Sequence, residues 1–270
     1  MSLCRRLHIG LVCMLVLVTG LGFALALPWL ANLSSMAAKL PNLSEWAHNP
    51  QAAPRYYVAK SGNGSDPTAG WDTAFKTVQD ALAAAALTSG GEIWVAAGVY
   101  YPDQGAGQMN DWVSSTFVLS DNVALYGGFD TGDDSFSDRD WAANLTVLSG
   151  DIDGNDAHTD GVVLNAANIN GRNAYHVVSA SGVSVSAVLD GFTITAGQAD
   201  GGAAPMNTGG GFFCDGSGTG STCSPRLSNL TFSGNYAVGG GAIYNSSRLG
   251  GEASPILNGV TFSGNSADTG

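Results

Sequence analysis

Charged residues are scarce in this 270-residue chain and make up 12 % of it. Basic residues are the rarest, with ten Lys and Arg against 22 Asp and Glu, so the net charge is −12. A protein that binds nucleic acid needs clustered basic side chains for its phosphate contacts, and this composition excludes that class of partner. Only three of the acids are Glu. Because Asp favours turns, the excess of Asp indicates a chain with many turns.

Long apolar runs are equally scarce, and the one that approaches the length of a membrane span lies at 9–27. It follows Arg5 and Arg6 and ends in the small-x-small pattern ALA at 24–26. This arrangement predicts a secretory signal over 1–27, and the alternative is an uncleaved anchor that engages the membrane. Both interpretations imply that the remaining chain is exported.

After the signal, residues 28–54 contain Pro41 and Pro50 and no sustained periodicity, so we predict a linker there. The folded body then occupies 55–270, which is long enough to bury a core.

Cysteine is also rare, with four residues, of which Cys4 and Cys13 fall in the targeting segment. Cys214 and Cys223 are left for the mature body. Because an exported protein meets an oxidising environment, we predict a disulfide between these two residues. A zinc site fits poorly, since four ligands are needed and no His is near either Cys in the sequence.

Glycine, in contrast, is abundant, with 38 residues, and the C-terminal region repeats. The stretch 225–235 reads PRLSNLTFSGN and the stretch 255–265 reads PILNGVTFSGN, and we call them the first and second copy. Apolar residues alternate in each copy, as in a β-strand. A GGGFF segment at 209–213 and a GGGAI segment at 239–243 keep the same spacing. Repeats of this length are typical of solenoids, so we predict an all-β fold, namely a parallel β-helix.

The repeat also predicts structural roles for individual residues. In stacked parallel strands identical side chains lie about 4.8 Å apart, and Asn amides can hydrogen-bond along the stack. We therefore predict an asparagine ladder through Asn235 and Asn265, the alternative being plain turn formation. The remaining repeat residues comprise an inward row of aromatic rings and a glycine turn: Phe232, Phe262, Gly240 and Gly241.

The FSGN and GGGAI segments resemble the paired FxxN and GGA[ILV] motifs of polymorphic outer-membrane protein repeats. Those repeats belong to the pectin-lyase-like, right-handed parallel β-helices, and the resemblance covers 189–270. The GGGFF segment departs from the motif, since Phe212 stands where the alanine is expected. A weaker copy at 189–197 lacks the Asn, so the ladder is expected to begin after it.

The period changes once in the body, where apolar residues share one helical face: Phe75, Val78, Leu82 and Ala85. We predict a helix over 73–88 that Asp72 or Thr73 caps and that Gly90 and Gly91 end. This segment and its flanking strands at 56–59 and 92–101 resemble the N-terminal part of bacterial pectin-lyase-like β-helices, in which a helix covers the first coil. The alternative is an ordinary αβ unit.

Short apolar stretches then recur between polar, Gly-rich segments, and the sequence predicts strands at 117–119, 123–126, 146–148, 162–164, 176–178 and 188–194. The two longest predicted loops, 102–115 and 129–144, are expected to project from the coils.

One acidic segment has the composition of a cation site, with Asp151, Asp153, Asn155 and Asp156 close together. Ca²⁺ takes six to eight oxygen ligands. An EF-hand is excluded because Asp156 stands at its glycine position and no Glu closes the loop. A looser Ca²⁺ site is the only cofactor that the sequence indicates, and the alternative is a solvated turn.

The predicted function follows from export and architecture. We expect a secreted or outer-membrane, cell-surface β-helix that is adhesin-like, structural or carbohydrate-binding. Its expected partner is a surface glycan or a ligand on a host or neighbouring cell. The alternative is a secreted Ca²⁺-dependent polysaccharide lyase or glycoside hydrolase, although no motif identifies catalytic residues.

The second copy stops where a further GGA segment is expected. This predicts that the chain is a truncated part of a longer repeat protein. An open strand edge would then favour end-to-end self-association.

Overall fold

The computed structural model describes residues 53–269. The predicted signal or anchor at 1–27 and all but the end of the predicted linker at 28–54 lie outside the described residues. The described part is mainly β, with one α-helix, α4 (Val78–Leu87). Among these residues no helix is both long enough and apolar enough to cross a membrane.

The largest sheet contains, in this order, β1 (Arg55–Val58), β2 (Gly91–Ala96), β5 (Val123–Phe129), β8 (Val188–Asp190), β13 (Arg226–Ser228) and β18 (Ile256–Asn258). A second sheet contains β3 (Gly98–Tyr100), β6 (Thr146–Ser149), β9 (Thr193–Thr195), β14 (Thr231–Ser233) and β19 (Thr261–Ser263). A third contains β4 (Phe117–Leu119), β7 (Val178–Ser181), β11 (Phe212–Asp215) and β16 (Ile243–Ser246).

Two smaller sheets complete the set. One consists of β10 (Gln198–Ala199), β15 (Tyr236–Gly239) and β20 (Ser266–Thr269), and the other of β12 (Thr222–Cys223) and β17 (Glu252–Ala253). Short 3₁₀ turns lie in the connections, at η1 (Trp71–Thr73), η2 (Phe136–Asp138), η3 (Ala166–Asn168) and η4 (Arg248–Gly250).

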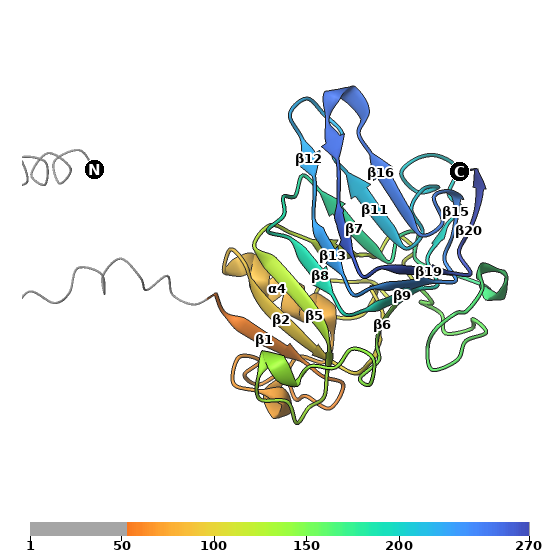
Figure 1. Ribbon diagram of the computed structural model, residues 1–270. Coiled ribbons are helices and arrows are strands. Elements are labelled where there is room, and N and C mark those ends of the chain that lie inside the picture. Colours follow the sequence, from red (N-terminus) through yellow and green to blue (C-terminus); the bar gives the residue numbers. More distant parts are fainter. Residues whose placement is uncertain (1–52, 270) are drawn as a thin grey trace, which may run out of the picture. The chain divides into compact units, whose positions relative to one another are not determined.

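Neighbouring strands in these sheets run parallel and follow one another in chain order. From β2 to β19 the chain adds strands to the three larger sheets in rotation, and Figure 1 shows the stacked arrows. An all-β fold with parallel sheets is confirmed.

The core lies between the sheets and consists of rows of inward side chains. In the largest sheet Leu125, Leu189 and Leu227 are paired in register and fully buried. In the second sheet Ile194 and Phe232 are paired in the same way. Full burial of such a side chain stabilises the fold by about 1.5–3 kcal/mol.

The helix begins later than the sequence predicts. Neither Asp72 nor Thr73 caps it, because Phe75 is extended and bridges Val58 of β1. Thr77 is the N-cap, and its hydroxyl oxygen accepts the backbone N–H of Asp80 at 3.2 Å. The helix packs against β1, β2 and β4, the first strands of two sheets. The predicted end is confirmed, since α4 stops at Leu87 and the Gly90 N–H bonds to the Ala85 carbonyl at 2.9 Å.

The predicted strand at 162–164 is wrong, because this stretch belongs to the connection between β6 and β7. The Val163 N–H donates to the Thr195 hydroxyl at 3.0 Å, and the Ser233 hydroxyl donates to the Val163 carbonyl at 2.9 Å. Its backbone thus bonds to side chains of β9 and β14 and to no parallel neighbour. We call residues 161–168 the strap, since it crosses successive strands.

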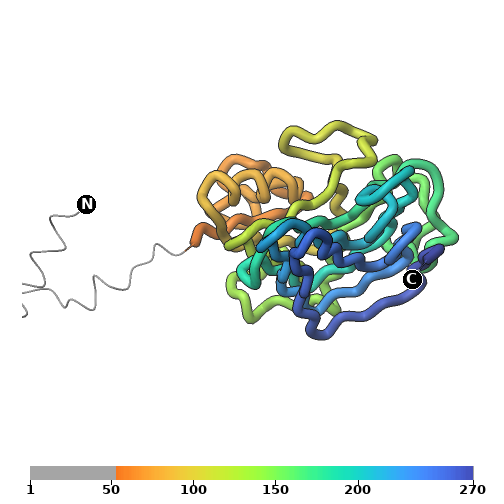
Figure 2. Tube along the Cα trace, turned by 90° about the horizontal axis from the view of Figure 1, so that it is seen from above, coloured from red at the N-terminus to blue at the C-terminus, as the bar shows by residue number. Residues whose placement is uncertain are grey.

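The other long connections agree better with the sequence. The predicted loop at 102–115 contains no strand, and the only strand residue in the predicted loop at 129–144 is Phe129, the last residue of β5. Figure 2 shows the first of them, in yellow, standing away from the sheets. The longest connection without an α-helix, 150–177, was not predicted as one loop.

The first and second copies stack in the predicted register. Phe232 pairs with Phe262, and the two rings are stacked with centroids 5.5 Å apart. The Asn235 side-chain amide donates to the Oδ1 atom of Asn265 at 2.9 Å, 30 positions along the chain. Asn235 in turn accepts the Gly197 N–H at 2.9 Å. The asparagine ladder is therefore present, and it begins after 189–197 as expected.

The glycine segments stack one residue away from the predicted register. Phe212 pairs with Ile243 and not with Ala242, so Gly211 occupies the alanine position of the motif. This register keeps Phe212 fully buried, whereas a shift by one residue would turn its side chain outward. Gly240 has a φ of +65° at the turn between β15 and β16, and a Cβ at Gly241 would lie 2.0 Å from the Ser266 carbonyl oxygen. Both positions therefore require glycine.

Candidate ligand-binding groove

Aromatic rings form a stack on the outer face of the third sheet. Side chains alternate along β11, so that Phe212 and Cys214 are buried while Phe213 is partly exposed. The Phe213 ring stacks on Tyr244 of the paired strand β16, with centroids 6.2 Å apart. On its other side it stacks on His176 at 5.0 Å. Three rings therefore follow one another across neighbouring segments of the chain.

His176 is held in one tautomer. Its Nδ1 lies 3.0 Å from the Gly209 carbonyl oxygen. Since a carbonyl oxygen only accepts, Nδ1 carries the hydrogen and Nε2 is the free acceptor. Burial lowers the pKa of His176, so the ring is neutral at pH 7 and the aromatic stack has no charge.

A groove of about 160 Å³ lies beside this stack. Phe213 and Tyr244 line it together with three residues of the 200–211 connection, Ala204, Pro205 and Thr208. The rest of the lining is polar: Asp215, Ser217, Ser246 and Arg248. An aromatic wall with a few polar groups is the usual composition of a small ligand site.

Hydrogen bonds fix the polar end of the groove. The Asp215 carboxylate accepts the Ser217 backbone N–H at 2.9 Å, and the Ser217 and Ser246 hydroxyls lie 2.8 Å apart. The two ion pairs within residues 53–269 are Arg55–Glu92 and Arg139–Asp190. Asp215 and Arg248 thus line one groove without neutralising each other.

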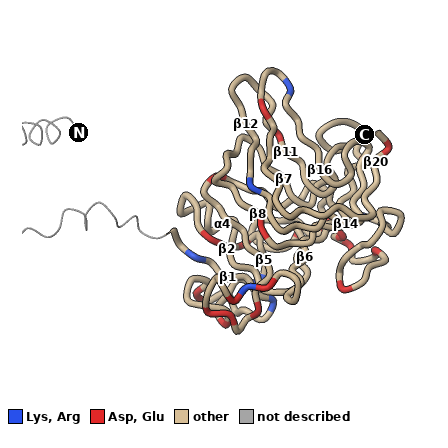
Figure 3. Tube along the Cα trace, viewed as in Figure 1, with Lys and Arg blue, Asp and Glu red and all other residues tan. Residues whose placement is uncertain are grey.

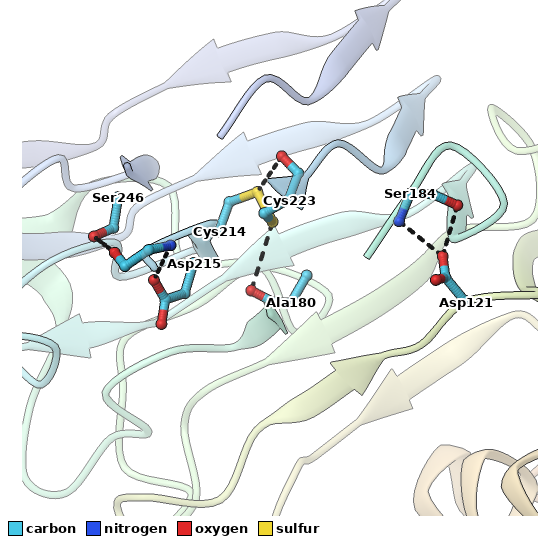
Figure 4. The surroundings of a disulfide bond; sticks show 8 residues. Asp121, Ala180, Ser184, Cys214, Asp215, Cys223 and Ser246 are labelled. Carbon is cyan, nitrogen blue, oxygen red and sulfur yellow. Dashed lines mark hydrogen bonds between the residues drawn. A yellow bond between two sulfur atoms is a disulfide. The ribbon is translucent and has the colours of Figure 1, made fainter. Parts of the chain in front are cut away.

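The predicted disulfide supports the groove from the inside. Cys214 and Cys223 are bonded, with Cα atoms 5.8 Å apart, and both are fully buried. Cys214 stands between Phe213 and Asp215 on β11, and Figure 4 shows the bond beside the Asp215 and Ser246 side chains. The bond joins β11 to β12 and so limits the movement of the loop that carries Ser217.

The acidic residues concentrate elsewhere. Figure 3 shows most of the red segments in the loops below β1 and in the loop at the right, while the strands are mainly tan. The groove is therefore not part of the most acidic surface.

The residues of the predicted Ca²⁺ site serve to fold their own loop. Asp151 accepts the backbone N–H of Asn155 at 3.1 Å, and Asp153 accepts the Asn155 side-chain amide at 2.9 Å. Asp156 accepts the side-chain amide of Asn173 at 2.7 Å, and burial raises its pKa. In the described part of the chain no three acidic, His or Cys side chains are grouped to hold a metal ion. The Ca²⁺ site therefore stays a prediction.

The side chain of the basic residue Arg139 forms structural contacts within the fold. Arg139 is 8 % exposed, and its guanidinium is 2.5 Å from Asp190 and also bonds the Gly127 carbonyl. It lies over the rings of Tyr126 and Trp141. Such a buried ion pair holds loop 129–144 to the largest sheet.

Sequence reasoning missed the groove residues Phe213, Tyr244, Asp215 and Arg248. A signal was present, because an aromatic residue stands at the second strand position after each glycine segment. In the register of the structure these two residues pair, and alternation then places both on the outer face.

No protein-family model, no curated protein and no solved structure matches this chain, so the groove is interpreted from its own geometry.

Proposed function

We propose that this protein is an exported, right-handed parallel β-helix that binds a ligand at the cell surface. The function is adhesin-like: stacked coils provide a rigid frame, and loops and one groove are presented to the outside. Three observations support the proposal. They are the parallel sheets built in chain order, the asparagine ladder and the disulfide, which suits an oxidising compartment.

The observation that carries a binding role is the groove beside Phe213 and Tyr244. It combines an aromatic wall with two opposite charges that have no ion-pair partner in the described residues. The two rings and Asp215 come from the paired strands β11 and β16, and Ser217 comes from a loop next to the disulfide, so little motion is needed to present these groups. A preorganised site of this kind favours binding because few side chains must be ordered on association.

The test is to express the full chain with a C-terminal tag in a bacterial host and to treat intact cells with protease. We expect the 55–270 body to be digested, or released into the medium, while a cytoplasmic marker stays intact. Retention of an uncleaved, protease-resistant chain in the cytoplasm would overturn the proposal.

A second measurement separates binding from catalysis. Purified protein is incubated with polygalacturonate and Ca²⁺, and the absorbance of unsaturated uronate is followed together with reducing-sugar release. We expect no turnover. Turnover would favour the lyase or hydrolase alternative.

A further inference from the structure

We infer that the groove beside Tyr244 is a binding site for a neutral oligosaccharide, with one sugar ring packed on the Tyr244 ring. The inference rests on the proposed function, since it names the ligand class of the same site.

Tyr244 offers an aromatic face to a ligand. One face of its ring stacks on Phe213, at 6.2 Å. Tyr244 is partly exposed and lines the groove, and among residues 53–269 no ring other than Phe213 stacks on it. A pyranose ring has a flat face of C–H groups, and the electron-rich face of an aromatic ring attracts such partly positive hydrogens. The stack beneath Tyr244 holds its ring in place.

The polar groups at the end of the groove match sugar hydroxyls. The Asp215 carboxylate has one oxygen bonded to Ser217 and can accept hydrogen bonds from two neighbouring hydroxyls. Arg248 can donate to hydroxyl or ring oxygens. Hydrogen bonds to ionised groups are about twice as strong as neutral ones, so these two residues would fix the orientation of the ring.

The charge of the molecule selects a neutral ligand over an acidic one. The chain has a net charge of −12, and the groove contains one basic side chain beside one carboxylate. A polyuronate would place a carboxylate near Asp215 and approach a negatively charged protein, and both effects oppose association. Neither repulsion opposes the association of a neutral glycan.

The size of the groove indicates weak binding. At about 160 Å³ it is smaller than typical ligand pockets of roughly 300–1,000 Å³, so it holds a sugar unit and not a long segment. We expect a Kd of about 0.1–1 mM for each site. A protein displayed in many copies on a surface would gain avidity from such sites.

The test is a titration of the purified full chain with a panel of neutral hexasaccharides, namely β-1,4-linked oligomers of glucose, mannose, xylose and galactose. Hexagalacturonate is the charged counterpart. We expect at least one neutral oligomer to bind in the stated range and hexagalacturonate to bind at least tenfold more weakly. Absence of neutral binding at about 10 mM, well above the expected Kd, would overturn the inference, as would equal binding of the uronate.

Variants locate the site. Tyr244→Ala is expected to weaken binding at least tenfold and Tyr244→Phe less than threefold, because the ring supplies the contact. Asp215→Asn is expected to weaken binding severalfold. Tyr236→Ala is the matched control, since Tyr236 points outward from β15 and bonds Asp268 at 2.7 Å. A loss that is the same for Tyr236→Ala and Tyr244→Ala would overturn the assignment.

The urea midpoint of each variant is measured alongside. If Tyr244→Ala does not fold, the exposed Arg248→Ala takes its place, and unchanged affinity in that variant would count against the site. A chain that reaches the cell surface but binds no neutral oligomer removes the glycan inference and leaves the proposed function. Cytoplasmic retention removes the proposed function itself.

Discussion

The first and second copies have almost the same sequence and very different surroundings. Phe232 is fully buried, whereas Phe262, in the same position of the second copy, is 51 % exposed. Leu227 and Leu257 differ in the same way. Strands pair with β14 on both sides but with β19 on one side only. In stacked parallel strands, the burial of an inward residue therefore depends on both neighbouring strands and not only on its own repeat.

The asparagine ladder follows the same rule. Asn235 bonds to Gly197 on one side and to Asn265 on the other, whereas Asn265 donates to the Phe232 carbonyl on its inner side. Substitutions at matched positions test whether this difference in surroundings changes the free energy of unfolding.

The largest difference is expected for the aromatic row. Phe232→Ala should destabilise the protein by about 3–5 kcal/mol, as for other buried Phe residues. Phe262→Ala should cost about 1 kcal/mol, because half of its ring is already in water. Urea denaturation of both variants measures the two values. Equal losses would show that the second copy is covered in solution.

The disulfide is the next largest difference between neighbouring coils, since the residues of β16 and β17 that pair with Cys214 and Cys223 are Asn245 and Ala253. The double variant C214A/C223A should lose about 2–4 kcal/mol, because the bond restricts the unfolded chain. Reductant should lower the urea midpoint of the wild type and leave that of the double variant unchanged. A wild type insensitive to reductant after unfolding would contradict the bond.

A smaller difference is expected for the ladder. Asn235→Ala leaves the buried Gly197 N–H without its acceptor, which should cost about 1–3 kcal/mol. Asn265→Ala is expected to cost about 1 kcal/mol or less, since water can reach the groups that it leaves. The two free energies of unfolding are compared in the same buffer. A larger loss at Asn265 would reverse the interpretation of the ladder.

The smallest effect is expected for the pH dependence of stability, which involves His176 in the aromatic stack with Phe213 and Tyr244. Burial lowers the pKa of His176 below its ordinary 6.5, so the unfolded chain binds the proton more readily than the folded one. Stability is therefore lost as pH falls from 6.5 towards the folded pKa, and no loss is expected above 6.5.

The measurement is the difference in unfolding free energy between wild type and His176→Gln at pH 7.5 and pH 5. The wild type should lose more stability on acidification. Burial raises the pKa values of Asp103 and Asp156, which stabilises the fold on acidification, but both residues are present in each protein and cancel in the comparison. Equal losses would mean that His176 titrates normally.

The sequence by itself determined the features that depend on neighbouring repeats. Alternating apolar residues and a constant spacing were sufficient to predict parallel strands, the pairing of Phe232 with Phe262 and the Asn235–Asn265 ladder. Two cysteines left in a body that we predict to be exported were sufficient to predict their bond. These features are local to one repeat or to two repeats in register, and the period encodes them.

Only the tertiary structure decided the features that depend on segments far apart in the chain. Phe75 pairs with Val58 and so delays the start of α4 to Val78. Val163 lies in the strap, because its backbone bonds to side chains of later strands, and no local pattern announces such a partner. The glycine segments shift by one residue because Phe212 must point into the core, and that shift aligns Phe213 with Tyr244 to form the wall of the groove.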